Sequence, residues 1–403
     1  MQATPGGMLS VDEALEVLLA DARAVDGVEQ VSTLDATGRV LAADQRSEID
    51  VPPLDNTSMD GYAVRVSDCV EGARLRIAQR IAAGDVGSAL EAGTAARIFT
   101  GAPVPAGADA VVMQEVCTVE CDAVLINEPP SAGQWIRRVG EDIRAGSTIL
   151  HTGRKLLPQD IGLAASVGLA ALPVYRRLKV AVFFTGNELV MPGEALPKGS
   201  IYNSNRYTLT GLLRTLGCEI VDLGIVPDTL AATREAFRKA AAGNDLIITS
   251  GGMSVGEEDH VKPAVEAEGK LDMWRIAMKP GKPLAFGHVG DAAFIGLPGN
   301  PVSTLVTFMI FVRPFILKQQ GATVVAPRTY TMRADFVWPQ PDVRREFLRA
   351  RISSAGGLEL FPNQSSAVLT SAVWGDGLID VAPRKPIAQG QTVRFLPFAE
   401  LLQ

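Results

Sequence analysis

The feature that most constrains the fold is an alternation of buried strands and amphipathic helices that begins at residue 179. Apolar runs such as KVAVFF (179–184) and DLIIT (245–249) are typical of buried strands, and TLAATREAFRKAAAG (229–243) is typical of an amphipathic helix. A long apolar helix is predicted from Pro301, with Asn300 as its cap. Alternating strands and helices form a mostly parallel sheet with helices on both faces. This part of the chain is therefore predicted to be a doubly wound α/β domain.

The remaining segments predict a multidomain α/β protein with three smaller parts. Ser10 and Glu13 form a capping box at an N-terminal helix, and a second helix is expected over 154–176, packed back on the first. Between them lie short strand-like runs broken by Gly and Pro. The predicted parts are a helical N-terminal/linker domain (1–45 plus 146–178), an inserted β-rich domain (46–145), the central α/β domain (179–325) and a small C-terminal β-barrel (326–403).

Composition excludes several classes of function. The net charge is -7 and the pI about 5.2, so broad electrostatic capture of nucleic acid is not expected. Four cysteines are too sparse for a disulfide framework, and Cys117 and Cys121 lack the partners of a zinc site; a cytoplasmic location fits this usage. The N-terminus lacks the features of a signal peptide, and the apolar run 302–312 is too short to span a bilayer, so no membrane role is expected.

Chemically active side chains follow the predicted strands of the α/β domain. In open parallel sheets, ligands bind outside the carboxyl ends of the strands. The residues expected at these strand exits are Glu188, Asp228, Asp259, Lys279, Lys282 and Ser303. Glycine turns, a helix N-terminus and two lysines favour an anion, and three carboxylates favour a hard cation. A nucleotide- or diphosphate-like ligand bound together with Mg²⁺ satisfies both requirements.

Each of these features has a simpler structural interpretation. A lone glycine turn is more often structural than functional, and the two lysines on their own could be surface charges. Asp60 before Gly61 is consistent with a plain hairpin turn, and Thr100 lies near the mouth of a proline-stiffened loop. Arg137 and Arg138, followed by Glu141 and Asp142, are by themselves best explained as mutually paired surface ions. The argument for function therefore depends on all of these residues and motifs taken together, and not on any one of them.

Seven motifs occur in one order along the chain, and together they resemble the molybdopterin molybdenumtransferase family of the MoeA type, which is related to the E domain of gephyrin. The motifs are DNTSMDGYAVR, TGAPVPAGADAVVMQE, IRRVGEDI, TGNEL, SGGMSVGEEDHVK, MKPGKPLAFG and GLPGNPVS. The resemblance covers nearly the whole chain and is weakest near the C-terminus. It implies an enzyme of molybdenum cofactor biosynthesis that inserts molybdate into adenylylated molybdopterin with Mg²⁺ and releases AMP.

The resemblance also implies an elongated homodimer whose cleft combines the β insertion of one subunit with the α/β and C-terminal domains of the other. Its partners would be the pterin nucleotide, molybdate, the adenylyltransferase and proteins of molybdoenzyme maturation. The catalytic residues implied by motif are Asp60, Thr100, Asp142, Glu188, Lys279 and Lys282. Mg²⁺ would be held by Glu188, Asp228 and Asp259. The residues implied for binding the pterin nucleotide or molybdate are Asp228, Gly251, Gly252, Ser254, Gly256, Pro298, Gly299, Ser303, Arg349 and Ser365.

Some positions depart from the family pattern. Arg275 stands where lysine is expected in some members, which keeps the charge but changes the geometry. LRA replaces LRG, so Arg351 is the alternative to Arg349, and NQSSAVL leaves Ser366 as the alternative to Ser365. Two other functions remain open: adenylylation of molybdopterin, which the α/β domain also resembles, and a non-catalytic scaffold similar to the gephyrin E domain.

Overall fold

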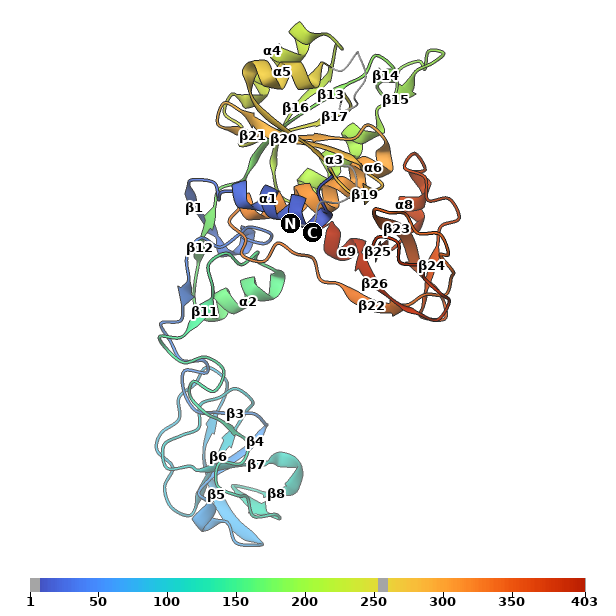
Figure 1. Cartoon of the computed structure of the whole chain (residues 1–403). Coiled ribbons are helices and arrows are strands. Elements are labelled where there is room, and N and C mark those ends of the chain that lie inside the picture. The colour runs from blue at the N-terminus through green and yellow to red at the C-terminus, as the bar shows by residue number, and fades with distance from the viewer. Residues whose placement is uncertain (1–7, 253–259, 403) are drawn as a thin grey trace.

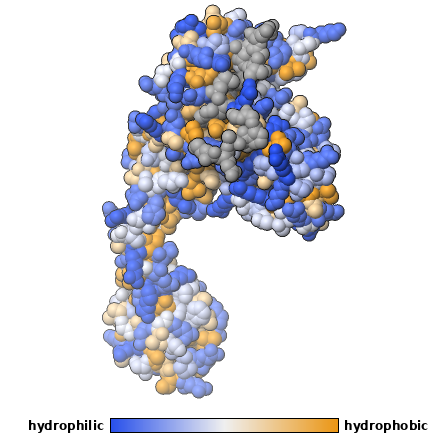
Figure 2. Space-filling model, viewed as in Figure 1, coloured by the Kyte–Doolittle hydropathy of each residue, from blue (hydrophilic) through white to orange (hydrophobic). Residues whose placement is uncertain are grey.

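The computed structural model describes residues 8–252 and 260–402, and Figure 1 shows an elongated molecule. The central domain and the C-terminal sheet lie side by side at one end, and the β-rich domain lies at the other. The narrow neck between these ends is also visible in the space-filling view (Figure 2). The chain leaves the main body through this neck and returns through it.

The central sheet is mixed, with a parallel half and an antiparallel half. Its strand order is β16 (Glu219–Val226), β13 (Lys179–Thr185), β17 (Leu246–Ser250), β21 (Ala292–Leu297), β20 (Pro283–Val289) and β18 (Gly269–Arg275). The first four strands are parallel, whereas β20 runs antiparallel to both β21 and β18. The predicted mostly parallel α/β domain is therefore confirmed, with an antiparallel edge that the alternation of strands and helices did not reveal. Since β18 runs in the same direction as the parallel strands, the 276–282 loop lies at their carboxyl edge.

Helices cover both faces of this sheet. Helices α4 (Leu230–Ala241) and α5 (Val261–Glu268) pack on one face, where Phe237 lies against the rings of Phe183 and Phe294. The opposite face buries the elements α3 (Ser204–Thr215), α6 (Pro301–Thr307), the π-helical turn η4 (Phe308–Val312), α7 (Arg313–Gln319) and the N-terminal helix α1 (Val11–Asp21). The central strands β13, β17 and β21 are covered on both faces, so their sequences are almost wholly apolar, whereas the edge strands β16 and β18 carry charged residues.

The long apolar helix Pro301–Gln319 is a core element. By length and composition it could cross a membrane, but 89% of its apolar window is buried inside the protein. Pro301 occupies its first position, as predicted, because its missing N–H would be unpaired there in any case. Asn300 is at the N-cap position, but its side chain makes no capping hydrogen bond, contrary to the expectation.

The neck is built from outgoing and returning strands that pair with each other three times. Strands β1 (Val28–Ser32), β2 (Gln45–Arg46) and β3 (Asn56–Thr57) pair antiparallel with β12 (Ala171–Tyr175), β11 (Thr148–Leu150) and β10 (Ile136–Arg137), respectively. At its end lies a six-stranded sheet of β7 (Ala110–Met113), β4 (Gly61–Val64), β6 (Thr94–Ile98), β5 (Ala73–Ile81), β9 (Ala123–Ile126) and β8 (Cys117–Glu120). The β-rich sheet is thus reached through a paired outgoing and returning segment.

The helix expected over 154–176 is wrong in its length and in its packing. Helix α2 spans only Pro158–Ser166, and the chain then enters β12, where Val174 and Tyr175 pair with the N-terminal strand β1. Helix α2 packs in a cluster with Leu41 and Leu150, whereas α1 is buried in the core of the central domain. The N-terminal part is therefore a mixture of helix and paired strands, because Pro173 and β-branched Val174 favour extended backbone.

The prediction of a small C-terminal β-barrel is only partly confirmed, because the outer strands of this sheet are joined by a single isolated bridge between Ala334 and Leu358. Its strands are β22 (Tyr330–Arg333), β26 (Thr392–Pro397), β25 (Gly377–Val381), β23 (Arg345–Ile352) and β24 (Leu358–Leu360), with the short helices α8 (Thr370–Trp374) and α9 (Phe398–Leu401). The strand β19 (Met278–Lys279), contributed by the central domain, pairs parallel with β23. This pairing ties the two domains together beside the predicted ligand site.

Candidate functional site

A cavity of about 730 Å³ opens at the carboxyl edge of the central sheet, where the C-terminal sheet meets it. Ten of the residues implied for the site line it: Glu188, Asp228, Gly251, Gly252, Lys279, Lys282, Pro298, Gly299, Ser303 and Ser365. They come from the exits of five strands, β13, β16, β17, β18 and β21, and from a loop of the C-terminal domain. Ser254, Gly256 and Asp259 lie outside the described residues. The topology thus brings together residues that are up to 177 positions apart.

Two glycines of this cavity occupy positions that no other residue fills without strain. Gly251 has φ +98° and Gly281 has φ +102°, in the region that favours glycine. A Cβ atom on Gly251 would lie 2.5 Å from the carbonyl oxygen of Thr185, and one on Gly281 would lie 2.4 Å from Thr307 Oγ1. The glycines therefore allow neighbouring turns to approach closely and bring backbone groups to the cavity wall.

Buried side chains hold the turn that follows β21. The Asn205 amide nitrogen Nδ2 donates to Ser250 Oγ at 2.8 Å and to the carbonyl oxygen of Gly299 at 2.7 Å. Thr304 Oγ1 donates to the carbonyl oxygen of Pro298. These bonds fix the exits of β17 and β21 relative to each other. Ser303, in the first turn of the long helix, is only 4% exposed and lies in the wall that these turns form.

The two lysines of the KPGKP loop have different surroundings. Lys279 Nζ lies 3.1 Å from Glu346 Oε1 and 3.5 Å from Asp342 Oδ2, both on the C-terminal domain. Lys282 is exposed, and among the described residues no carboxylate forms an ion pair with it. Lys282 is therefore the lysine whose charge is available to an anion, and Lys279 is already partly neutralised.

Arg344 is a cavity residue that sequence reasoning missed. Its guanidinium binds Asp342 in a two-point contact at 2.9 and 3.0 Å, and this hydrogen bonding holds the pKa of the Asp342 carboxyl well below its usual range. Other lining residues that were not predicted are Thr185, Gly186, Pro280, Gly281, Pro283, Asn300 and Gln364. Arg344 belongs to the run RREFLRAR, whose four arginines are equivalent by sequence. Only the tertiary pairing of β23 with β19 shows that Arg344 is the arginine of this run that lines the cavity.

Arg349 does not line the cavity in this structure but lies behind its wall, so its role as an anion ligand stays a prediction. It is 1% exposed; Nε donates to Ser371 Oγ at 3.0 Å and Nη2 to the carbonyl oxygen of Ser365 at 3.2 Å. Burial lowers the pKa of its guanidinium to about 10. Arg351, the alternative, pairs with Glu359 and stacks on Trp374. Arg349 therefore supports the loop that carries Ser365.

Ser365 and Ser366 both line the cavity, so the structure does not choose between them. The loop that contains both serines is held by hydrogen bonds to two different elements, β23 and the long apolar helix. Gln364 exchanges two hydrogen bonds of 2.9 Å with the backbone of Arg349, and the Val302 amide donates to the carbonyl oxygen of Ser366 at 3.0 Å. The loop therefore connects the C-terminal sheet to the start of the long helix.

The cavity carries charges of both signs. Lys279, Lys282 and Arg344 provide cations, and Glu188 and Asp228 provide carboxylates. Within residues 8–252 and 260–402, no group of three or more His, Cys, Asp or Glu side chains is arranged to hold a metal ion. The described residues therefore contribute two of the three predicted magnesium ligands to one cavity.

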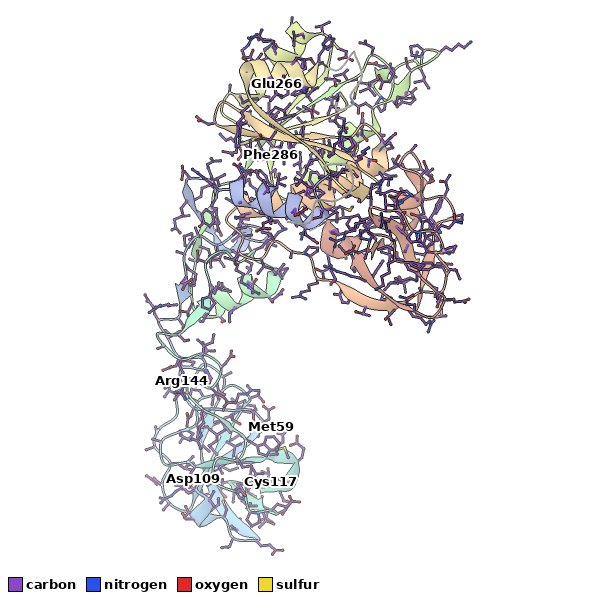
Figure 3. All side chains as sticks on the ribbon, in the orientation of Figure 1. Met59, Asp109, Cys117, Arg144, Glu266 and Phe286 are labelled. Atoms are coloured by element: carbon purple, nitrogen blue, oxygen red, sulfur yellow. The ribbon has the colours of Figure 1, made fainter. Side chains whose placement is uncertain are left out.

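A second group of predicted residues lies at the far end of the molecule. Asp60 Oδ1 accepts hydrogen bonds from the Thr100 amide at 2.7 Å and from Thr100 Oγ1 at 2.8 Å, and these bonds lower the pKa of Asp60. Figure 3 labels Met59, the neighbour of Asp60, in the β-rich domain and Phe286 in the distant central sheet. Within one chain, Asp60 and Thr100 are together but remote from the cavity.

The predicted ionic cluster around Asp142 is arranged differently from the expectation. Arg138 pairs with Asp55 at 2.6 Å, and its amide donates to Glu141 Oε2 at 2.8 Å. Asp142 is exposed, and its amide donates to the carbonyl oxygen of Val51 across the neck. The ion pair between Arg138 and Asp55 therefore holds the 138–142 segment against the neck, while Asp142 is exposed to solvent.

Comparison with protein families gives three matches that together span most of the chain. They are "MoeA N-terminal region (domain I and II)" over residues 9–168, "Probable molybdopterin binding domain" over residues 181–318 and "MoeA C-terminal region (domain IV)" over residues 331–398. The candidate cavity lies between the regions covered by the second and third matches.

Individual relatives match over nearly their full lengths. A molybdopterin molybdenumtransferase of Haemophilus influenzae is 40% identical over 98% of this chain and 100% of its own length. Molybdopterin molybdenumtransferase 2 of Mycobacterium tuberculosis is 37% identical over 93% of this chain and 95% of its own. The crystal structure of a molybdopterin biosynthesis moeA protein from Pyrococcus horikoshii OT3 superimposes with a TM-score of 0.85 and 28% identity, over 97% of this chain and 100% of that one.

Proposed function

The chain belongs to the MoeA family of molybdopterin molybdenumtransferases, enzymes of molybdenum cofactor biosynthesis, and we propose that it inserts molybdate into adenylylated molybdopterin with Mg²⁺ and releases AMP. The observation that carries the finer proposal is one cavity lined both by Lys282 and by the carboxylates of Glu188 and Asp228. One ligand that needs both signs is a phosphate group accompanied by a divalent cation.

The lysine side of the cavity suits molybdate. Molybdate is a tetrahedral dianion, so the ammonium group of Lys282 and hydroxyl donors such as Ser303 and Ser365 offer charge-assisted hydrogen bonds. Lys279, held by Glu346, supplies a second charge at a fixed position. The dithiolene sulfurs belong to the substrate, so the reaction requires no cysteine nucleophile from the protein.

The carboxylate side fits Mg²⁺. This cation usually takes one or two protein carboxylates and completes its shell with water and substrate phosphates, and Glu188 and Asp228 provide that donor set. When bound, Mg²⁺ neutralises charge on the phosphate oxygens of the departing nucleotide. Glu188 and Asp228 would hold the cation, and the glycine turns would offer backbone N–H groups to the phosphate group.

The remote Asp60–Thr100 group supports a further part of the proposal. If the protein is a homodimer, the β-rich domain of one subunit can face the cavity of the other and complete it. The elongated shape and the long neck make such an exchange geometrically reasonable (Figure 1). We retain the four-part division at residues 46, 146, 179 and 326 as a proposal, together with a cytoplasmic location.

An assay of both products tests the function. Purified protein is incubated with adenylylated molybdopterin, Mg²⁺ and increasing molybdate, and AMP and active cofactor are measured together. We expect cofactor formation to depend on molybdate and to be accompanied by AMP release. Adenylylation of unmodified molybdopterin by ATP, with no molybdate-dependent cofactor formation, would instead identify an adenylyltransferase.

A further inference from the structure

The pair formed by Asp60 and Thr100 is held by hydrogen bonds that are open to solvent. Asp60 directly precedes β4, and Thr100 follows β6, the strand that pairs with β4 in the β-rich sheet. Because the two bonds between them are solvent-exposed, water competes for both. The two segments therefore keep a fixed mutual geometry only if other contacts hold them.

Arg97, on β6, makes such contacts with the backbone beside Asp60. Its Nη1 donates to the carbonyl oxygen of Gly61 at 3.0 Å. Its Nη2 donates to Gln114 Oε1 at 2.5 Å, and the Gln114 amide in turn donates to the carbonyl oxygen of Asp60 at 3.1 Å. Two consecutive carbonyl groups, those of Asp60 and Gly61, are thus attached to one guanidinium, one directly and one through Gln114.

The same guanidinium also contacts the segment that carries Thr100. Phe99 follows Arg97 by two residues, so both side chains lie on one face of the sheet. Arg97 Cζ lies 4.5 Å from the centroid of the Phe99 ring, a distance at which a cation is attracted to an aromatic face. Phe99 directly precedes Thr100. Arg97 therefore touches both segments, the main chain next to Asp60 and the ring next to Thr100.

The charge of Arg97 supports the same arrangement. The hydrogen bonds from Thr100 are the main reason that the pKa of Asp60 lies below its ordinary value, and the positive charge of Arg97 adds to their effect. Among residues 8–252 and 260–402, no carboxylate forms an ion pair with Arg97. Its charge therefore favours the ionised form of Asp60, which is the form that accepts both bonds.

From these contacts we propose that Arg97 is a positioning residue, which fixes the Asp60 loop against the Thr100 turn and so sets the direction of the Asp60 carboxylate. Arg97 acts through Asp60 and does not itself need to touch the substrate. This inference rests on the proposed function, because that function places the Asp60–Thr100 group at the cavity of the partner subunit.

The first test is independent of the reaction. Hydrogen exchange of the Thr100 amide, resolved by NMR, reports how often its bond to Asp60 opens. We expect Arg97→Gln to accelerate this exchange by roughly tenfold, the size of one lost charge-assisted hydrogen bond, at an unchanged melting temperature. Arg80→Gln is the matched control. Among the described residues, Arg80 lies opposite Arg97 on β5 and stacks on the same Phe99 ring at 4.4 Å, but it donates no hydrogen bond to either segment.

The second test is a double-mutant cycle in the product assay. Arg97→Gln should lower kcat by roughly ten- to a hundredfold and leave the KM for molybdate nearly unchanged, because the misplaced group acts in the reaction and not at the lysine loop. When Asp60→Asn is already present, Arg97→Gln should lower the residual rate by less than about threefold. Arg97→Lys should restore little activity, because lysine keeps the charge but not the planar two-point contact.

Three results would overturn the proposal. One is a further loss of about tenfold or more when Arg97→Gln is added to Asp60→Asn, because Arg97 would then act independently of Asp60. Another is wild-type activity or unchanged Thr100 exchange in Arg97→Gln. The third is an equal effect of Arg80→Gln. Failure of the proposed function would look different, since the wild type would form no cofactor while Thr100 exchange would still respond to Arg97→Gln.

Discussion

The ammonium nitrogen of Lys279 lies 3.1 Å from a carboxylate oxygen of Glu346, a residue that is only 1% exposed. The other oxygen of Glu346 accepts hydrogen bonds of 2.9 Å from Trp338 Nε1 and from the Asp342 amide. This contact joins the lysine loop of the central domain to strand β23 of the C-terminal sheet. It also distinguishes Lys279, which has counter-charges, from Lys282, which lines the cavity and forms no ion pair with a carboxylate of residues 8–252 or 260–402.

Glu346→Gln should destabilise the protein by about 1–3 kcal/mol, because the change removes the buried counter-charge of Lys279 and leaves an imperfect partner for the neighbouring donors. Denaturant unfolding monitored by fluorescence gives the free energy of unfolding. Glu359→Gln is the control, since Glu359 pairs with Arg351 at the surface, and it should cost less than about 1 kcal/mol. Equal losses in the two variants would contradict the role given to Glu346.

Lys282→Gln should raise the apparent KM for molybdate by roughly ten- to a hundredfold, because it removes a charge-assisted hydrogen bond but keeps much of the side-chain length. Molybdate is titrated at saturating adenylylated molybdopterin. Lys262→Gln, at an exposed position of helix α5, removes the same charge outside the cavity and should leave the titration unchanged. A normal molybdate response with weakened nucleotide binding would place Lys282 on the phosphate side.

Glu188→Gln should increase the Mg²⁺ concentration required for half-maximal activity by about tenfold or more, since an amide oxygen is a weaker ligand for a hard cation than a carboxylate. Thermal unfolding should be nearly unchanged because Glu188 lies at the cavity wall. Glu194→Gln, in the loop that follows, serves as the control. An unaltered Mg²⁺ titration of the Glu188 variant would remove this residue from the proposed cation site.

Asp60→Ala and Lys279→Ala should each be nearly inactive alone and should regain activity when mixed dimers form. The reason is that Asp60 directly precedes β4 of the β-rich domain, whereas Lys279 belongs to β19 at the opposite end of the molecule, so a site containing both requires two subunits (Figure 1). Co-expression with two different affinity tags isolates the mixed dimers, and activity is compared with each parent. Verified mixed dimers that remain inactive would argue against a shared site whose two copies work independently.

The acid dependence of stability should report the Asp342–Arg344 contact. Hydrogen bonding by Arg344 lowers the folded-state pKa of Asp342, so its contribution to stability is complete above its ordinary pKa of about 4. That contribution is lost as the pH falls through the folded-state pKa. The difference in unfolding free energy between wild type and Asp342→Asn should therefore shrink as the pH falls from about 6 to about 3. Arg344→Gln should behave similarly, and a constant difference would contradict this account.

Much of the fold and part of the cavity could be predicted because they depend on local patterns. The alternation of strands and helices after residue 179 predicts a mostly parallel sheet, and the carboxyl ends of such strands share one edge. Glu188 and Asp228 lie within three residues of a strand end and Ser303 lies in the first turn of the helix after β21, so their presence at one cavity followed from the order of the elements. The capping box of Ser10 and Glu13 was predicted because its hydrogen bonds span only three residues.

Other features depend on which distant segments meet, and only the tertiary structure determined them. Val174 lies in a strand because β1, more than 140 residues earlier, pairs with it. Strand β23 is buried on both faces, so its sequence does not show that Glu346 contacts Lys279 while Arg349 points behind the wall. The sequence by itself determined the local elements and the family motifs. Long-range strand pairing determined which charges face the cavity, because pairing partners and burial depend on the whole assembled chain.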